Sequence, residues 1–231
     1  MLEFPADIIS IIKESLKKVA IIDYQMGNLF SVKQACLHVG LEPVVTSEKK
    51  ILLEADAAIL PGVGAFGEAM SHLRQLDFID SIKEFVKTGK PFMGICLGMQ
   101  LLFSKSEEFG IHEGIGIIPG KVVRFINLVK NNRRRKVPHV GWNQINFASH
   151  IKSWEQTPLE TVAVGQYMYF VHSFYTIPDD TNVVVTETNY ENVQYCSAVL
   201  NQNVFATQFH PEKSGEEGLK IYKKWASMIQ S

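Results

Sequence analysis

One cysteine of this chain stands in a local pattern that suits a nucleophile. Cys96 lies in the segment Gly94-Ile95-Cys96-Leu97-Gly98, after a short apolar run and before a helical pattern. Such a tight turn from strand to helix leaves room only for small residues two positions before and after the nucleophile. The sulfur then stands above the edge of a sheet, where the N-terminus of the following helix favours a thiolate. The pattern predicts a cysteine nucleophile; the alternative is a small buried hydrophobic residue, the usual role of a free cysteine.

The other two cysteines lack this setting. Cys36 falls within a helical pattern and Cys196 within a strand pattern, so we expect both to pack in the core. Three widely spaced cysteines with no CxxC pair exclude a disulfide framework and argue against a zinc site. We therefore expect a protein of the reducing cytoplasm with no metal and no other cofactor.

A histidine and a glutamate stand two residues apart near the C-terminal end of the chain. His210-Pro211-Glu212 follows an apolar run that predicts a strand, and open α/β sheets place their ligands beyond strand ends. Pro211 biases His210 toward extended backbone, in which residues i and i+2 point the same way. We therefore predict that Glu212 holds one imidazole nitrogen while the other faces the thiol of Cys96, as in a catalytic triad.

A glycine-rich turn provides a third element of the same chemistry. Pro61-Gly62-Val63-Gly64 follows another apolar run. Two glycines allow a backbone N–H group to approach a bound carbonyl oxygen, as an oxyanion hole requires. We expect N–H groups of Val63 or Gly64, together with that of Leu97 after the cysteine, to bind an oxyanion. The alternative is an ordinary turn between a strand and a helix.

The elements that must position these residues alternate through the first hundred positions. Strands are predicted at 19–23, 43–46, 57–60 and 91–95. A helix is predicted to end at Gly40, two helical pieces divided near Asp77 at 66–88, and another helix from 97 to about 103. This alternation predicts an open, mostly parallel α/β sheet with helices on both faces.

From Gly114 onward the pattern becomes rich in β segments, at 122–125, 142–147, 167–174, 183–187, 195–200 and 204–209. We expect additional antiparallel strands in this C-terminal half, followed by a terminal helix at about 216–229. No internal repeat or linker interrupts residues 19–231, which predicts a single domain. Residues 1–18 are predicted to form a separate helical extension, because Ile8, Ile12 and Leu16 share one face.

The composition is that of a folded protein with no general attraction for polyanions. Of the 231 residues, 46% are hydrophobic and 20% charged, with a formal net charge of −1, which argues against nucleic acid as a partner. No apolar run approaches the roughly 20 residues that span a membrane, and the N-terminus is unlike a secretory signal. The basic segment 130–136 is interpreted as a solvated loop or, alternatively, as a contact for a phosphate or partner.

Together these motifs match a known family. Gly94-Ile95-Cys96-Leu97-Gly98-Met99-Gln100 with His210-Pro211-Glu212 resembles the class I, triad-type glutamine amidotransferases. Pro61-Gly62-Val63-Gly64-Ala65-Phe66, Pro138-His139-Val140-Gly141-Trp142-Asn143 and Tyr169-Phe170-Val171-His172-Ser173 resemble in particular the glutaminase subunit of imidazole glycerol phosphate synthase, in histidine biosynthesis. The resemblance covers about residue 19 to the end, and residues 1–18 precede the usual start of the family.

The resemblance implies a flavodoxin-like fold, L-glutamine as substrate, and a separate synthase (cyclase) subunit of the (β/α)8 type that receives ammonia. It implies a substrate-binding set and a set at the partner interface. The substrate-binding residues are Gly64, Gln100, Glu108 and the backbone of Ser173 and Phe174. The partner-interface residues are Asn28, Trp142, Tyr169 and Lys213. Phe174 departs from the tyrosine of many relatives, which removes one hydroxyl contact.

The expected reaction is hydrolysis of glutamine by Cys96, His210 and Glu212, with transfer of ammonia to the partner. Some relatives amidate bacterial surface sugars instead, and a stand-alone γ-glutamyl hydrolase or a non-enzymatic subunit are rival classes. His172 has two interpretations, a second catalytic histidine or a buried hydrogen-bonded one, and we favour the second. The remaining histidines show no metal-ligand spacing.

Overall fold

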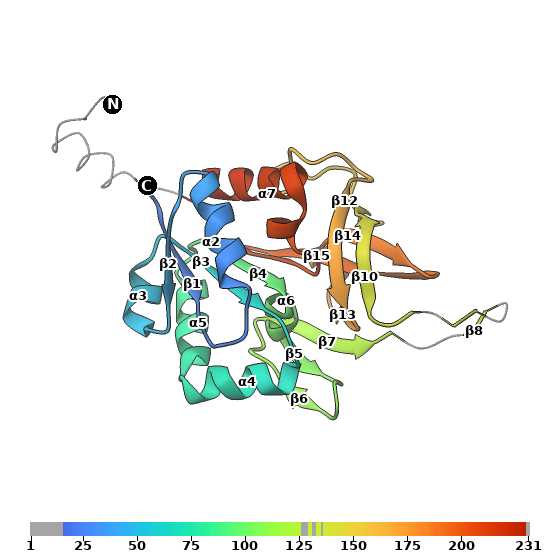
Figure 1. Ribbon diagram of the computed structural model, residues 1–231, viewed down its shortest axis with the longest axis horizontal. Helices are drawn as coiled ribbons and strands as arrows, with labels where there is room; N and C mark the ends of the chain where they lie inside the picture. The colour runs from blue at the N-terminus through green and yellow to red at the C-terminus, as the bar shows by residue number, and fades with distance from the viewer. Residues whose placement is uncertain (1–15, 126–128, 131–132, 135, 230–231) are drawn as a thin grey trace.

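The computed structural model in Figure 1 describes residues 16–125, 129–130, 133–134 and 136–229. Its central feature is a run of parallel strands in the spatial order β2-β1-β3-β4-β16. These strands are β1 (Lys18–Ile22), β2 (Glu42–Thr46), β3 (Ala57–Gly62), β4 (Phe92–Cys96) and β16 (Val204–Thr207). Every residue of β3, β4 and β16 is buried, as expected for parallel strands covered on both faces.

Helices cover both faces of this parallel run (Figure 1). One face is covered by α2 (Leu29–His38) and α7 (Gly215–Ser227), and the other by α3 (Lys49–Glu54), α4 (Phe66–Gln75), α5 (Phe78–Lys87) and α6 (Leu97–Leu101). Strand side chains alternate between the two resulting cores: Ile21 packs with α2 and α7, whereas Ile22 packs with the helices opposite. The helices on both faces confirm the predicted α/β architecture.

Beyond β16 the sheet continues mainly with antiparallel pairs, through β15, β13, β7, β5 and β6. The β7–β5 pair is parallel, β14 joins the sheet by pairing with β15, and β11 pairs with β14. The bounds are β5 (Phe103–Ser106), β6 (His112–Glu113), β7 (Ile118–Arg124), β11 (Asn146–Phe147), β13 (Phe174–Pro178), β14 (Val184–Tyr190) and β15 (Val193–Asn201), with the short 3-10 helix η1 (Thr181–Val183) before β14. The antiparallel additions predicted for the C-terminal half are confirmed.

Two shorter antiparallel pairs stand apart from this sheet. Strands β10 (His139–Gln144) and β12 (Tyr167–His172) pair with each other, as do β8 (Val129–Lys130) and β9 (Arg133–Arg134). The single strand predicted at 167–174 is therefore wrong in one respect, because Ser173 separates β12 from β13 and the two strands enter different sheets. The described part of segment 130–136 contains β9 and the end of β8, and is not wholly loop.

One predicted helix end differs from the structure because a strand pairing replaces the helix there. The helix predicted to reach about residue 103 ends at Leu101, because Phe103 begins β5 and pairs with Ile118. The short helix α3 was not predicted. The break near Asp77 is confirmed by its left-handed backbone, φ 54° and ψ 37°. The helix predicted over 1–18 lies outside the described residues as far as position 15, and Lys18 already belongs to β1.

No helix in the described ranges is long and apolar enough to cross a membrane.

The contact between α6 and β3 fixes the turn that carries Cys96. An ideal Cβ atom on Gly98 would lie 1.8 Å from the carbonyl oxygen of Leu60, so only glycine allows the helix to approach the strand this closely. A Cβ atom on Gly94 would lie 3.1 Å from the carbonyl oxygen of Gly98. A side chain at either glycine of the predicted nucleophile turn would therefore crowd the backbone.

Gly98→Ala should destabilise the fold, since the added methyl group collides with the backbone of β3, which is fixed by its pairing with neighbouring strands. We expect the free energy of unfolding to fall by about 3 kcal/mol, measured by urea denaturation. Gly27→Ala is the matched control, because its Cβ would meet a proline ring carbon of Pro61 at 3.3 Å, and we expect a change below about 1 kcal/mol. Equal effects of the two substitutions would contradict the proposed steric constraint.

Candidate active site

Three segments that are distant in sequence meet at one edge of the parallel sheet. Gly62 pairs with Cys96, and Thr207 pairs with Ile95, so β3, β4 and β16 end side by side. The turns that follow these strands carry the glycine-rich segment, the cysteine and His210. The parallel register thus brings together the three elements that the sequence predicted separately.

Cys96 lies at the junction of β4 and α6 in a strained backbone conformation. Its φ is 56° and its ψ is −109°, which is uncommon for a residue with a side chain. The residue is 6% exposed and lines a cavity. Its sulfur lies 3.8 Å from the carbonyl oxygen of Val171 and 3.7 Å from the amide nitrogen of Gln208. This geometry is that of a nucleophile turn.

His210 and Glu212 form the predicted pair. His210 Nδ1 lies 2.8 Å from Glu212 Oε1, and the two side chains are 2% and 1% exposed. The backbone differs from the prediction, because the residues after His210 form the 3-10 helix η2 (Pro211–Lys213) instead of continuing an extended segment. His210 itself is extended, and its N–H and C=O groups are bound by Tyr169 O and Ser214 Oγ. The contact was predicted correctly for a partly wrong reason.

The charge on His210 is set by its neighbours. Burial alone would lower the pKa of His210, but the thiolate of Cys96 and the carboxylate of Glu212 outweigh burial and raise this pKa from 6.5 to about 10. Since Nδ1 faces Glu212, Nε2 is the nitrogen left for the sulfur; this buried nitrogen has no hydrogen-bond partner among the described residues. An imidazole with a carboxylate at one nitrogen and the other nitrogen left for a sulfur is the arrangement expected of a cysteine nucleophile with its acid and base.

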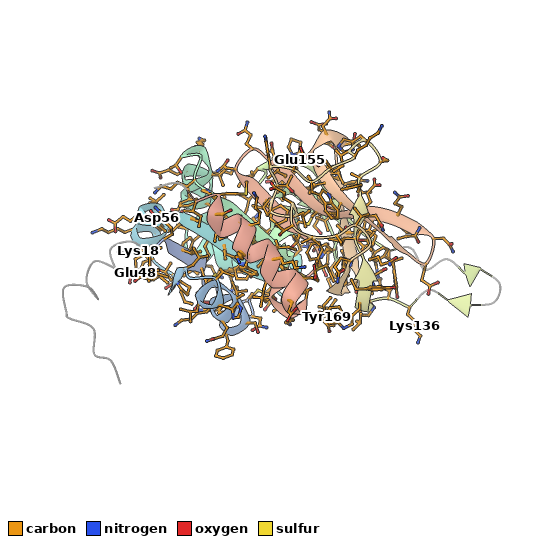
Figure 2. All side chains as sticks on the ribbon, turned by 90° about the horizontal axis from the view of Figure 1, so that it is seen from above. Lys18, Glu48, Asp56, Lys136, Glu155 and Tyr169 are labelled. Carbon is orange, nitrogen blue, oxygen red and sulfur yellow. The ribbon has the colours of Figure 1, made fainter. Side chains whose placement is uncertain are left out.

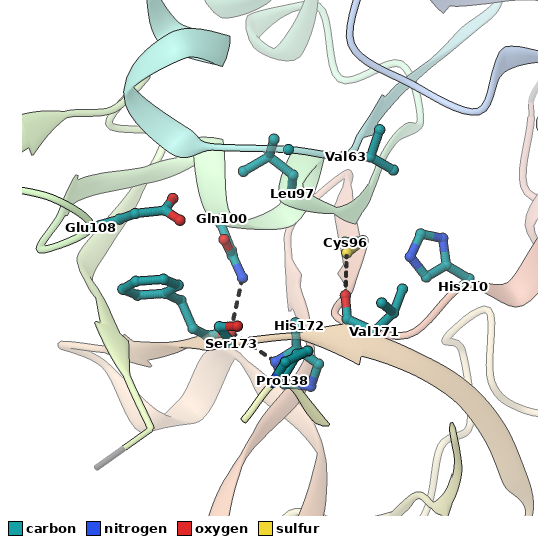
Figure 3. A pocket seen from close by; sticks show the side chains of 12 residues that line it. Val63, Cys96, Leu97, Gln100, Glu108, Pro138, Val171, His172, Ser173 and His210 are labelled. Atoms are coloured by element: carbon teal, nitrogen blue, oxygen red, sulfur yellow. Dashed lines mark hydrogen bonds between the residues drawn. The ribbon is translucent and has the colours of Figure 1, made fainter. Parts of the chain in front are cut away.

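The cavity in front of Cys96 has a volume of about 290 Å³ (Figure 3). Figure 3 shows His210 on one side of Cys96 and Gln100 and Glu108 on the other. The lining residues are Val63, Gly64, Cys96, Leu97, Gln100, Glu108, Pro138, Val171, His172, Ser173, Phe174 and His210. Every residue predicted for the oxyanion hole or for substrate binding is among them, and Glu212 lies behind His210.

Two polar side chains at the far end of the cavity are held by protein contacts and keep one oxygen each for a ligand. Gln100 donates through Nε2 to Phe174 O at 3.0 Å and to Gln208 Oε1 at 2.9 Å, which leaves Oε1 as an acceptor. Glu108 Oε2 accepts from Phe66 N at 2.7 Å, at the start of α4. Both acceptors suit a positively charged amino group.

The predicted oxyanion donors are only partly arranged for that role. Leu97 N is the first N–H group of α6 and has no acceptor within its own helix. Val63 N instead donates to Met26 O at 3.4 Å. Gly64 has φ +100°, where a side chain would be strained. The Val63 N–H group must therefore leave Met26 O before it can bind an oxyanion.

The four residues expected at a partner interface lie on elements that touch one another around η2. Asn28 caps α2, which contacts η2, and Lys213 is an exposed residue of η2. Tyr169 N donates to Ser214 Oγ at 3.0 Å, so Tyr169 lies beside the start of α7 (Figure 2). Trp142 is 56% exposed and pairs with Tyr169 across β10 and β12, with an edge-to-face ring contact at 6.1 Å.

His172 belongs to a buried hydrogen-bond chain, which fits the favoured interpretation of this residue. His172 Nδ1 lies 2.8 Å from Phe174 O, a group that can only accept, so Nδ1 carries the proton. Its Nε2 lies 3.2 Å from Tyr195 Oη, which lies 3.3 Å from His139 Nδ1. Burial lowers the pKa of His172 to about 3 and that of His139 to about 4. Both rings are therefore neutral near pH 7.

The sequence motifs did not predict three neighbours of the site, which are Gln208, Tyr195 and His139. Gln208 is fully buried at the end of a strand whose other residues are mostly apolar, and this polar exception was the available signal. Tyr195 and His139 left no such signal. Cys36 and Cys196 lie in the core, where burial raises the pKa of each thiol to about 12. Within the described ranges no group of three or more His, Cys, Asp and Glu side chains could hold a metal ion.

Comparisons with known proteins agree with this geometry. The family described as glutamine amidotransferase class-I matches residues 20–227. The chain belongs to this family.

Individual relatives within the family are more similar to this chain. The chain is 44% identical over 214 residues to the imidazole glycerol phosphate synthase subunit HisH of Geobacter sulfurreducens, covering 92% of this chain and 100% of the relative. It is 47% identical over 208 residues to the same subunit of Sulfurimonas denitrificans, covering 90% and 96%. Among solved structures, PurLQS from Thermotoga maritima shares the fold with a TM-score of 0.71 at 19% identity, covering 93% of this chain and 100% of that one. The predicted family is confirmed.

The three histidines near the cavity should titrate in widely separated ranges. We expect His139 and His172 to stay neutral down to about pH 4 and 3, because burial lowers each pKa, and His210 to keep its proton up to about pH 10. Below about pH 6.5 these two histidines bind more protons in the unfolded chain than in the folded one, so the free energy of unfolding should fall as the pH drops below 6.5. The stabilisation from His210 should be complete below about pH 6.5 and lost as the pH rises through 10.

Imidazole NMR titration measures the three transitions directly. Glu212→Gln should lower the pKa of His210, because it removes one of the negative groups that raise this pKa. Glu216→Gln, in the exposed first turn of α7, is the matched control and should leave it unchanged. A His210 that titrates near pH 6.5 in the unsubstituted protein would contradict the proposed ion pair.

Proposed function

We propose that this protein is the glutaminase subunit of an imidazole glycerol phosphate synthase. It hydrolyses L-glutamine to glutamate and ammonia through Cys96, His210 and Glu212, and passes the ammonia to a synthase partner. The observation that carries this proposal is the thiol and the carboxylate-bound imidazole on the wall of one cavity, in a chain 44% identical to a subunit of that name over that subunit's whole length. Residues 19–231 act as one glutaminase domain, and the reducing cytoplasm keeps the thiol usable.

The bound glutamine is oriented by its α-groups. The cavity of about 290 Å³ suits a ligand of amino-acid size. The free oxygens of Gln100 and Glu108 accept from the α-ammonium group, and the backbone at Ser173 and Phe174 holds the α-groups from the opposite wall. The side-chain carboxamide then lies over Cys96.

The first half of the reaction transfers the glutamyl group to sulfur. The thiolate of Cys96 attacks the carboxamide carbon, and the negative charge that develops on oxygen is bound by N–H groups of Leu97 and of Val63 or Gly64. One such donor is typically worth about 3 kcal/mol in the transition state. The imidazolium of His210 gives its proton to the departing nitrogen, the C–N bond breaks, and ammonia and a thioester remain.

The second half releases glutamate. Neutral His210 takes a proton from water, the oxygen adds to the thioester carbon, and the C–S bond breaks with its electron pair returning to sulfur. Glu212 holds the ring in the tautomer that each step requires. The thiolate–imidazolium pair is then restored for the next substrate.

The partner is a cyclase subunit of the (β/α)8 type, docked on the surface around η2. Free ammonia in water is protonated and lost, so an enclosed path to the acceptor requires a complex. Trp142 is exposed, and aromatic residues of this kind are enriched at interfaces, while Lys213 is an exposed residue of η2 itself. Binding of the partner also couples to the oxyanion hole, because Val63 N is engaged by Met26 O in the isolated chain.

Cys96→Ala should abolish glutamine hydrolysis, with a loss of about 10⁴-fold or more, because no other group supplies the nucleophile. The measurement is glutamate formation by the complex. Cys196→Ala removes a core thiol outside the cavity and should keep most of the activity. Turnover that survives in the Cys96 variant would refute the assigned nucleophile.

The hydrolysis rate should rise at least tenfold when a cyclase subunit from a relative such as Geobacter sulfurreducens is added, because the second oxyanion donor is then released. Trp142→Ala should weaken the complex by about 30-fold, as loss of a buried aromatic anchor does. Leu37→Ala, 48% exposed at the other end of α2 from Asn28, is the control and should not weaken it. Equal glutaminase rates with and without the partner would contradict the coupling and favour a stand-alone hydrolase.

A further inference from the structure

The orientation of two buried amides can be read from a single carbonyl group. Phe174 O can only accept, and it lies 3.0 Å from one terminal atom of Gln100, so that atom is the amide nitrogen. The same nitrogen lies 2.9 Å from one terminal atom of Gln208, which must therefore be an oxygen. The remaining terminal atom of Gln208 is the nitrogen, and it lies 3.7 Å from Cys96 Sγ.

The carbonyl that begins this chain is itself held in place. Phe174 O also lies 2.8 Å from His172 Nδ1, whose ring is linked through Tyr195 to His139. Gln208 is 0% exposed, and its backbone N–H donates to Ser197 O at 2.8 Å. If its amide turned over, its nitrogen would face the nitrogen of Gln100 and both contacts would be lost. A fixed N–H group therefore points at the sulfur from the protein interior.

We propose that Gln208 is a further catalytic residue of the glutaminase reaction, whose side-chain N–H group binds the Cys96 thiolate, with Gln100 as the residue that positions it. This inference builds on the proposed function. It gives the buried sulfur a donor other than His210, whereas the carbonyl oxygen of Val171 on another side can only accept. A buried anion needs such donors, because water does not solvate it.

The contact acts most strongly when the sulfur carries full negative charge. In the first half-reaction the sulfur gives an electron pair to the carboxamide carbon and loses charge, so the Gln208 contact favours the state before attack. In the second half, the C–S bond of the thioester breaks and its electron pair returns to sulfur, while the proton taken from water stays on His210. The N–H group of Gln208 meets the charge that develops on this leaving group, and so it should speed release of glutamate.

The first test measures the sulfur without any substrate. The isolated chain is treated with iodoacetamide over a range of pH, and the rate of alkylation at Cys96 is followed by peptide mass. Gln208→Met keeps the length of the side chain and removes the donor. We expect the pH of half-maximal alkylation to rise by about one to two units, the range of a hydrogen bond to a charged group, while the plateau rate at high pH does not fall. A purely structural role would lower the rate at every pH.

Two further variants keep the test decisive. Gln208→Glu retains an oxygen for Gln100 and the shape of the side chain, but it presents an acceptor to the sulfur, so we expect an upward shift at least as large. Gln194→Met makes the same chemical change as Gln208→Met at an exposed position of β15 and should shift nothing. An unchanged alkylation profile in a folded Gln208→Glu or Gln208→Met protein would overturn the proposal.

The second test uses the complex with glutamine. We expect kcat of Gln208→Met to fall about 10- to 100-fold with a smaller change in KM, and the glutamyl thioester on Cys96 to accumulate in the intact mass spectrum. No accumulation and an unchanged kcat would overturn the role in glutamate release. If the unsubstituted complex does not hydrolyse glutamine at all, the proposed function fails, but the shift in the alkylation profile still decides whether Gln208 binds the thiolate.

Discussion

The register of three parallel strands is the constraint on which the rest of the site depends. Gly62 opposes Cys96 and Thr207 opposes Ile95, so the three strands end within one residue of each other. A shift of β16 by one residue would invert which side chains face each core and would carry His210 away from the sulfur. The core therefore fixes the strand register: Ile59 packs against one layer of helices while its neighbours Ala58 and Leu60 pack against the other.

How much of this the sequence predicts depends on how local each feature is. The turn at Cys96 could be predicted because its glycines, strand and helix are contiguous, and the His210–Glu212 contact because the two residues are two positions apart. The contact between Gln100 and Phe174 joins residues 74 positions apart, and that between Gln208 and Cys96 spans 112. No local pattern encodes such pairs. The same reason explains why Phe103, helical by local pattern, is a strand residue in the fold.

The contact between His210 and Glu212 was predicted correctly, but the backbone conformation expected to produce it was wrong. Extended backbone was expected to turn Glu212 back toward the imidazole, whereas the chain forms a 3-10 turn after His210. The fixed φ of Pro211 is compatible with both, because proline suits the first position of a helix as well as an extended segment. The identities of the interacting residues could therefore be read from the sequence, but the path of the backbone between them could not.

The environment assigns opposite charge states to two chemically identical side chains that line the same cavity, His172 and His210. His172 is fully buried, and burial lowers its pKa by more than the hydrogen bond to the Phe174 carbonyl raises it; proximity to His139 and His210 lowers this pKa further. His210 is buried as well, but it meets a thiolate and a carboxylate. A protonated His172 would keep its Nδ1–H bond to Phe174 O, but its Nε2 could no longer accept from Tyr195 Oη, and its charge would repel that of His210. Neutral His172 and charged His210 are thus two parts of one electrostatic arrangement: the first holds the carbonyl that orients the amides behind the sulfur, and the second is the proton donor of the proposed reaction.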